Sequence, residues 1–295
     1  MRKALILGCG FVGVRAARLF ARAGWDVIGV TRSAASAARL AGTEAFRALA
    51  CDIADAASLS AASDLHGADA AISAVSPERG GEEGYREVYL RGLENAIACL
   101  APRRVLFVGS TSVYPQNNGS WVTEESLAEP LAPTSRILRE AEAVALAHGG
   151  QVARLAGIYG PGRSVLLRKV LDGSAVIEGD GARHINQIHA DDAAGALYHL
   201  IQNDLPPGIY NVVDDTPVTQ LECYGWIATS LGLPLPPRGP IDTQRKRGVT
   251  DKRVSNAKLR SLGWSLMYPS YRVALERDAA LLAAARGDGT GDARP

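Results

Sequence analysis

Cysteine is scarce in this chain, and its spacing argues against two kinds of site. The 295 residues include four cysteines, at positions 9, 51, 99 and 223, with no C-x-x-C pair and no cysteine–histidine spacing that suits a metal. Zinc sites and disulfide-stapled folds depend on such clusters. We therefore expect no metal, and we expect the cysteines to act as small buried hydrophobic residues in a reducing compartment.

Long apolar runs and net charge are lacking as well. No stretch reaches the ~18 apolar residues of a membrane span, and the apolar run after Met1-Arg2-Lys3 is too short for a signal peptide. The 32 basic and 31 acidic residues leave a net charge of +1, so overall charge does not favour nucleic acid or an anionic membrane. The sequence predicts a cytoplasmic protein that binds neither.

Basic residues concentrate in one segment. Arg238–Arg260 contains eight lysines and arginines against Asp242 and Asp251. The segment forms either a solvated basic face or the wall of a pocket for an anionic substrate, because guanidinium groups suit phosphate and carboxylate.

Strand-like and helix-like segments alternate through the first two-thirds of the chain. Apolar runs predict strands at 3–7, 26–30, 45–50, 69–74, 104–108 and 151–155. Amphipathic or capped segments predict helices at 12–23, 54–62, 82–100, 135–148 and 191–201. This alternation predicts an α/β fold, a Rossmann-type doubly wound parallel sheet with helices on both faces.

The pattern loosens after about residue 157. We expect a dinucleotide-binding domain over 1–157, with its sheet completed by segments around 184–213. Residues 158–285 then form mainly a smaller C-terminal substrate lobe. The polar, glycine-rich end, 286–295, is predicted to be a disordered tail.

A glycine-rich turn follows the first predicted strand directly and opens the first helix. Gly8-Cys9-Gly10-Phe11-Val12-Gly13 is a G-x-G-x-x-G motif in the context that it requires. The first glycine permits the tight turn, the second lets the backbone approach a pyrophosphate, and the third lets helix and strand pack closely. The free N–H groups of the helix N-terminus would then face the phosphates.

The end of the second strand indicates which dinucleotide is bound. An Asp or Glu there usually binds the ribose hydroxyls of NAD, but this chain has Thr31-Arg32-Ser33. A cation with two hydroxyls suits a 2′-phosphate, so NADP(H) is favoured over NAD(H). The alternative for Arg32 is a solvated loop residue. Asp52-Ile53 would face the adenine, and Ala74-Val75-Ser76 would line the underside of the cofactor.

Five motifs in sequence order carry a resemblance to a known family. Besides the glycine turn they are Gly109–Tyr114 (GSTSVY), Arg154–Gly162 (RLAGIYGPG), Ile188–Asp192 (IHADD) and Gly208–Val212 (GIYNV). The chain resembles the extended short-chain dehydrogenase/reductase superfamily, the NAD(P)-dependent epimerase/dehydratase group, from about residue 3 to 280. The resemblance implies that Leu155-Ala156-Gly157 runs past the nicotinamide.

The resemblance also implies a catalytic set of a hydroxyl residue, a tyrosine and a lysine. In the family the tyrosine exchanges a proton with the substrate oxygen while hydride moves to or from the nicotinamide. The lysine lowers the pKa of that tyrosine, and the hydroxyl orients the oxygen. The hydroxyl position, four residues before Tyr114, is Ser110.

The other two positions have changed. When the family motif Y-x-x-x-K-x-x-x-E is aligned on Glu142, Leu138 stands at the lysine position and Thr134 at the tyrosine position. Tyr89 replaces the motif asparagine of the fourth helix. Thr111 and Ser112 replace the Asp-Glu pair of sugar-nucleotide dehydratases, so dehydratase chemistry is not supported. The chain resembles an atypical member that keeps the cofactor fold without the Tyr/Lys pair.

Substitute groups are available elsewhere. The candidate proton donors are Tyr114, Tyr89, Tyr85 and His189, and the candidates for binding substrate are Tyr85, Arg163, Arg183 and His189. Each has a structural alternative: a packing aromatic for Tyr114, a surface charge for each arginine, and a hydrogen bond to the following helical turn for His189.

Two functions remain open from the sequence. One is an NAD(P)-dependent oxidoreductase or epimerase that acts on a hydroxyl or carbonyl carbon of a small substrate, such as a sugar or a nucleotide-linked one. The other is a non-catalytic NADP-binding redox sensor or scaffold, which the loss at Thr134 and Leu138 favours. The resemblance further implies a homodimer through the helices after strands four and five.

Overall fold

A seven-stranded parallel sheet forms the centre of the computed structural model, which describes residues 1–77, 81–242 and 250–287. The strand order is β12-β7-β5-β4-β1-β2-β3. The strands are β1 (Lys3–Leu7), β2 (Asp26–Thr31), β3 (Arg47–Ala50), β4 (Ala70–Ser73), β5 (Val105–Ser110), β7 (Gln151–Leu155) and β12 (Gly208–Val212). The predicted doubly wound sheet is therefore confirmed, and its order reverses between β1 and β4.

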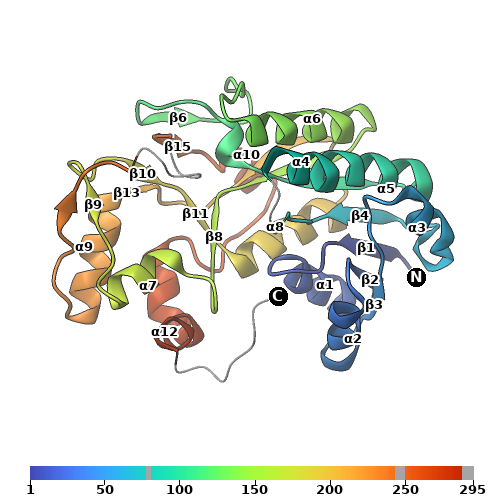
Figure 1. Cartoon of the computed structure of the whole chain (residues 1–295), viewed down its shortest axis with the longest axis horizontal. Coiled ribbons are helices and arrows are strands. Elements are labelled where there is room, and N and C mark those ends of the chain that lie inside the picture. Colours follow the sequence, from blue (N-terminus) through green and yellow to red (C-terminus); the bar gives the residue numbers. More distant parts are fainter. Residues whose placement is uncertain (78–80, 243–249, 288–295) are drawn as a thin grey trace.

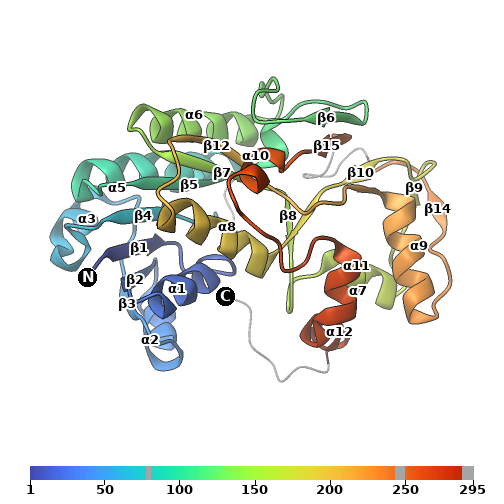
Figure 2. The same cartoon turned by 180° about the vertical axis from the view of Figure 1, so that it is seen from behind.

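Helices cover both faces of this sheet (Figures 1 and 2). On one face lie α1 (Gly13–Arg22), α2 (Ala34–Thr43) and α8 (Ala190–Gln202). On the other lie α3 (Ala56–Ala61), α4 (Gly81–Tyr85), α5 (Gly92–Leu100) and α6 (Pro133–Ala147). The sequence did not predict α2, because its apolar stripe is reduced to Ala37 and Leu40.

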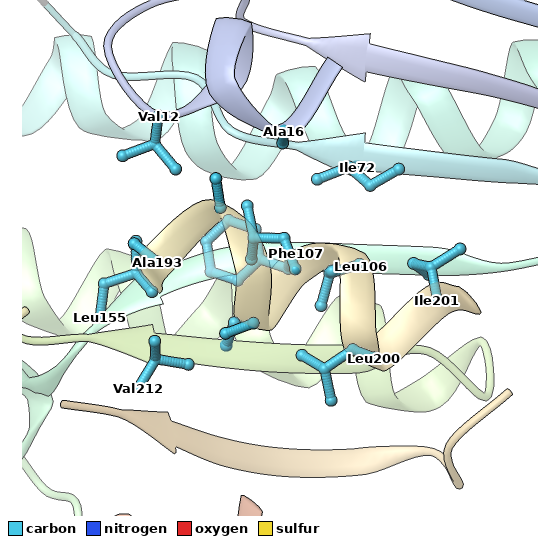
Figure 3. Packing of buried hydrophobic residues seen from close by; sticks show 14 of the residues in the cluster. Val12, Ala16, Ile72, Leu106, Phe107, Leu155, Ala193, Leu200, Ile201 and Val212 are labelled. Carbon is cyan, nitrogen blue, oxygen red and sulfur yellow. The ribbon is translucent and has the colours of Figure 1, made fainter. Parts of the chain in front are cut away.

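Alternate residues of β1 are buried on opposite faces, which explains its unbroken apolar run. Ala4 and Ile6 belong to the core under α1 and α8, and Leu5 and Leu7 belong to the core under α3 and α5. Figure 3 shows the first of these cores, where Val12 and Ala16 face Ile72, Leu106 and side chains of α8.

The predicted helix 82–100 is three segments. A π-helical stretch, Arg86–Arg91, joins α4 to α5. Such stretches are rare and bulge the helix locally. Here the π-helical residues pack against α6, so the bulge lies on the face of the sheet that holds the predicted catalytic helix.

The C-terminal lobe is built from α7 (Val165–Leu171), α9 (Gln220–Leu231), α11 (Tyr271–Arg277) and α12 (Ala279–Arg286). Its own core includes Leu167, Ile177, Ile227, Tyr271 and Leu281. The predicted tail 286–295 begins too early, since α12 extends to Arg286; residues 288–295 lie outside the described part of the chain.

Four two-stranded sheets lie outside the main sheet, and they either join strands within the C-terminal lobe or link the lobe to the main domain. They pair β8 (Gly157–Tyr159) with β11 (Gln187–His189), β9 (Ile177–Glu178) with β14 (Arg238–Gly239), β10 (His184–Ile185) with β13 (Val218–Thr219), and β6 (Ser120–Val122) with β15 (Lys252–Val254). The segment 184–213 thus contributes β12 to the main sheet, while β10 and β11 pair outside it. A short helix, α10 (Ala257–Ser261), follows β15.

A buried ion pair fixes α6 to the sheet. Arg154 of β7 donates two hydrogen bonds to Glu142 of α6, at 2.9 and 2.7 Å, and both side chains are fully buried. Arg139 also binds Glu142 from the same helix. The Arg154 guanidinium lies over the Tyr114 ring, 4.7 Å from its centroid.

Glu142→Ala is expected to lower the free energy of unfolding by about 3–5 kcal/mol, because it leaves the buried Arg154 charge without its partner. Urea denaturation measures the change. Arg139→Ala is the control and should lower it by no more than about 1 kcal/mol, since Arg139 is partly exposed. The double change Glu142→Met with Arg154→Met should recover most of the loss. Equal effects of the two single variants would contradict this account of the pair.

Candidate cofactor and substrate site

The glycine turn lies at the reversal of strand order, between the ends of β1 and β4. Gly8 has a φ of +90°, and a Cβ there would stand 2.6 Å from the Val75 backbone. A Cβ on Gly13 would stand 2.2 Å from the Gly8 carbonyl oxygen. Only glycine fits either position. The backbone of Ala74 and Val75 therefore lies directly against the glycine turn.

The N-terminus of α1 is open to an anion. Val12 precedes the helix, no side chain caps it, and its first turn contains no acidic residue. The first N–H groups of a helix have no partner within the helix. Together with the positive end of the helix dipole, they suit the phosphates of a dinucleotide.

Arginine side chains gather around Phe11 in the middle of the glycine turn. The guanidinium carbons of Arg15 and Arg163 lie 4.2 and 5.5 Å from the centroid of its ring. Arg15 also pairs with Asp191 at 2.9 Å. The sequence placed Arg163 with the substrate, and the structure brings its guanidinium over Phe11 of the glycine turn.

The end of β2 lies beside the glycine turn, since the Gly8 and Cys9 amides donate hydrogen bonds to the Val30 carbonyl. Ser33 caps α2 by accepting a hydrogen bond from the Ser36 amide, and Thr31 donates to the Ser33 carbonyl. Arg32 is exposed between them.

Asp52 and Ile53 differ in what they can contact. Asp52 is exposed and accepts a hydrogen bond from the Ala54 amide. Ile53 is buried, and its side chain packs against the backbone of Gly92 on α5. A surface carboxylate and a buried aliphatic residue thus follow β3.

Leu155-Ala156-Gly157 leaves the sheet between β12 and β11. The Ala156 amide donates to the Val212 carbonyl at 3.0 Å, and the Gly157 amide donates to the Asn186 carbonyl at 3.1 Å. Leu155 and Ala156 are buried, while Gly157 is exposed.

Ser110 stands at the carboxyl end of β5. Its hydroxyl oxygen accepts a hydrogen bond from the Ser112 amide and so caps the short turn Thr111–Val113. Ser135 of α6 donates to the Ser112 hydroxyl at 3.1 Å, which holds the start of α6 against this turn.

The predicted catalytic helix carries no acid–base group at the family positions. Thr134 is partly exposed in the first turn of α6, close to Ser135. Leu138 is buried in the hydrophobic core. An aliphatic hydroxyl and a leucine cannot exchange a proton readily at neutral pH, so α6 positions the turn after β5 but offers no general acid.

Tyr114 is a core residue. Its side chain is fully buried and donates a hydrogen bond to Asn211 of β12 at 2.8 Å. Burial raises the pKa of this phenol despite the nearby Arg154. These contacts correspond to the structural alternative, and we remove Tyr114 from the candidate catalytic set.

His189 is also buried, and contacts account for both ring nitrogens. Nδ1 accepts a hydrogen bond from the Asp191 amide and caps α8, and Nε2 lies 3.2 Å from Asp278. Burial lowers the pKa of this imidazole. The hydrogen bond to the helical turn is thus the role that the contacts support, and we leave His189 out of the substrate set.

Tyr85 precedes the π-helical stretch and is half-buried. Its ring lies 5.1 Å from that of Tyr89, and Tyr89 in turn lies edge-on to Phe107 of β5 at 6.0 Å. The aromatic row therefore extends from α4 to the strand that ends in Ser110.

A second group of polar side chains lies at the junction with the C-terminal lobe. Asp251 accepts two hydrogen bonds from His184, one from its amide and one from its ring, both at 2.8 Å. Arg183 is half-buried, and burial lowers its pKa. Its Nε atom is buried without a hydrogen-bond partner among the described residues. Lys252 follows Asp251 and is buried.

The sequence did not single out Lys252. It belongs to the basic segment Arg238–Arg260, of which residues 243–249 lie outside the described part. The described residues do not form one basic face: Arg253 lies over Trp121 and Lys258 lies over Tyr210, while Lys252 points inward. The signal that could have found it is strand alternation, because Lys252 shares a face with the buried Val254.

Two structural absences apply to the described residues. Within them no three His, Cys, Asp or Glu side chains come together as a metal site. In the same ranges, every helix is too short or too polar to cross a bilayer.

Comparisons with known proteins agree with this geometry. Protein YeeZ of Escherichia coli K12 is 30% identical over 282 residues, covering 91% of this chain and 97% of YeeZ. The 2′-dehydrokanamycin reductase of Streptomyces kanamyceticus is 30% identical over 157 residues, 48% of this chain and 45% of that protein. The structure of DesIV, a dTDP-glucose 4,6-dehydratase of Streptomyces venezuelae with NAD and TYD bound, superposes with a TM-score of 0.79 at 22% identity, covering 98% of both chains.

The model of the NAD dependent epimerase/dehydratase family matches residues 4–212, from β1 to the last strand of the sheet. This range includes the glycine turn, the Ser110 turn and α6. The chain belongs to the NAD dependent epimerase/dehydratase family.

Proposed function

We propose that the protein is an NADP-dependent oxidoreductase or epimerase that acts on a hydroxyl or carbonyl carbon of a small, sugar-like or nucleotide-linked substrate. One observation carries the proposal. The uncapped helix N-terminus behind the glycine turn lies at the carboxyl end of β1, and the Ser110 hydroxyl lies at the carboxyl end of β5, with only β4 between the two parallel strands; ligands of such sheets bind at this edge.

The space around the glycine turn fits a dinucleotide. A Cβ on Gly8 or Gly13 would meet protein backbone, but a Cβ on Gly10 would meet nothing within 4 Å. Gly10 therefore has no packing reason to be glycine, whereas a pyrophosphate held against its backbone would supply one. Thr31, Arg32 and Ser33 are the residues that would hold the 2′-phosphate.

The cofactor, when bound, supplies or accepts the hydride. The chain itself holds the phosphates at α1 and orients the substrate oxygen with the Ser110 hydroxyl. Placing two reactants in contact contributes an effective molarity on the order of 10⁵ M or more, whereas a general acid contributes about 10²–10⁴-fold. Loss of the Tyr/Lys pair on α6 therefore reduces the expected rate without removing the chemistry.

The relatives support the reaction class. One relative is named a 2′-dehydrokanamycin reductase, and the structural neighbour DesIV, at 22% identity, shares the fold. The second candidate function, a non-catalytic NADP-binding sensor or scaffold, is favoured by Thr134 and the buried Leu138. A turnover assay distinguishes the enzyme from the non-catalytic sensor or scaffold.

Gly10→Ala is expected to weaken NADPH binding by roughly 5- to 150-fold, the equivalent of about 1–3 kcal/mol of steric overlap. Thermal unfolding of the variant should match the wild type, because the added methyl group meets no protein atom. Gly8→Ala is the comparison variant and should unfold at a lower temperature, since φ is +90° there. Unchanged NADPH affinity in Gly10→Ala would contradict the site.

Arg32→Glu tests the preference for NADP. Loss of a charge-assisted hydrogen bond to the 2′-phosphate should weaken NADPH binding by at least about tenfold and leave NADH binding nearly unchanged. Fluorescence titration of both cofactors measures this. Arg39→Glu on α2 makes the same change in net charge and should have little effect. Equal binding of NADPH and NADH by the wild type would overturn the assignment.

Turnover of carbonyl compounds, sugars and sugar nucleotides, followed by NADPH absorbance, tests the reaction. Ser110→Ala should lower kcat by about 10²-fold, because a donor to the developing oxyanion is lost. Ser112→Ala, on the same turn, is the control. If NADPH binds but no member of the panel changes its redox state, the sensor function replaces the enzyme.

A further inference from the structure

A lysine ammonium is buried where β15 meets the loop after β5. Lys252 is 6% exposed. Its Nζ donates a hydrogen bond to the Tyr114 carbonyl oxygen at 3.0 Å and another to the Thr250 hydroxyl. Both acceptors are neutral. Among the described residues this ammonium has no ion-pair partner, and burial of such a charge is unfavourable, so stability alone does not favour a lysine at this position.

The backbone of Lys252 is held from two sides. β15 pairs with β6, with Lys252 opposite Ser120. The Asn186 side chain donates to the Lys252 carbonyl at 2.9 Å and accepts from the Val254 amide at 2.8 Å. Asn186 also accepts from the Gly157 amide through its own carbonyl. The lysine is therefore fixed at the junction of the main domain with the C-terminal lobe, next to the segment that follows β7.

Tyr114, whose carbonyl group Lys252 contacts, stands four residues after Ser110 in the chain. Tyr114 directly follows the 3₁₀ turn Thr111–Val113, which Ser110 caps. Such a turn rises about 2 Å per residue, so Ser110 and Tyr114 are separated by roughly 8 Å. A lysine side chain has a flexible four-carbon stem, which allows its ammonium to move from the Tyr114 carbonyl to an oxygen held by Ser110.

We propose that Lys252 exchanges the proton with the substrate oxygen, from β15 of the C-terminal lobe, in place of the group that α6 lacks. This inference rests on the proposed function and names its general acid. In the reducing direction the carbonyl carbon accepts the hydride, the π electrons move to oxygen, and that oxygen takes a proton from Nζ. The neutral amine then regains a proton from water. In the oxidising direction the neutral amine removes the hydroxyl proton as the hydride leaves the carbon.

The protonation behaviour of Lys252 suits this exchange. Burial lowers the pKa of its ammonium to about 8, and Asp251 beside it opposes the change. The other charged or titratable groups close to Asp251 are Arg183 and His184. A pKa near the working pH lets one group act as acid in one direction and as base in the other. Reduction needs the ammonium, so its kcat/KM should be level below pH 8 and fall as the pH rises above 8. For oxidation, which needs the neutral amine, kcat/KM should rise as the pH increases towards 8 and be level above it.

Lys252→Met and Lys252→Arg test the proposal, with Arg253→Met as the matched control on the outer face of the same strand. On a substrate that the wild type turns over, Lys252→Met should lower kcat by about 10²-fold and abolish the limb near pH 8. Lys252→Arg should move that limb out of the range pH 6–10, because a guanidinium stays charged. Arg253→Met should keep both the rate and the limb. NADPH affinity should change by less than about twofold in all three.

A measurement without turnover uses the wild-type protein after reductive ¹³C-methylation of its lysines. One dimethyl-lysine NMR resonance should titrate near pH 8 and be missing in Lys252→Met. Titration of that resonance above pH 10, or an unchanged kcat and pH limb in Lys252→Met, would overturn the role of Lys252 while NADPH binding and turnover still support the proposed function. A wild type that neither binds NADPH nor turns over the panel overturns the function, and with it the role of Lys252.

Discussion

The buried pair of Glu142 and Arg154 is the interaction on which the site side of the sheet depends. It joins α6 to β7 with two hydrogen bonds in a region without water access. Removing either partner would leave a buried charge, so the two elements can separate only at a large free-energy cost. The pair also supports the Tyr114 ring beneath the guanidinium, and through it the turn after β5.

A polar network continues from this pair to β12 and to the residues just beyond β15. Tyr114 donates to Asn211, and the backbone amide of Asn211 donates to Glu124 in the loop between β6 and α6. The Asn211 side chain donates to the Ser255 carbonyl, just beyond β15. The ends of β5, β7 and β12 are therefore fixed relative to the strand that carries Lys252. A network of this kind is rigid because an unsatisfied member would be costly.

The network gives α6 a structural role that does not depend on Thr134 and Leu138, the residues at the family's Tyr and Lys positions. The helix still supplies Glu142 to the buried pair and Ser135 to the Ser110 turn. Thr134 and Leu138 lie on the same helix, and neither disturbs these contacts. The contacts that hold α6 in place thus come from residues other than those at the family's Tyr and Lys positions.

The sheet and the glycine turn could be predicted from the sequence, because they depend on local periodicity and on the close packing that Gly8 and Gly13 require. The resemblance to the family, rather than periodicity, indicated that Thr134 and Leu138 stand at the Tyr and Lys positions. The helix α2 could not be predicted from the sequence, because its two buried residues make too weak an apolar stripe.

The tertiary structure was needed to show which of these polar side chains are buried and which groups they bind. Tyr114 and His189 stand beside family motifs, yet long-range partners, Asn211 and Asp278, bind both of them in the interior. Lys252 stands in a basic segment that suggests a surface, yet the pairing of β15 with β6 turns it inward. Burial and hydrogen-bond partners come from segments far apart in the sequence, and local pattern holds no information about them.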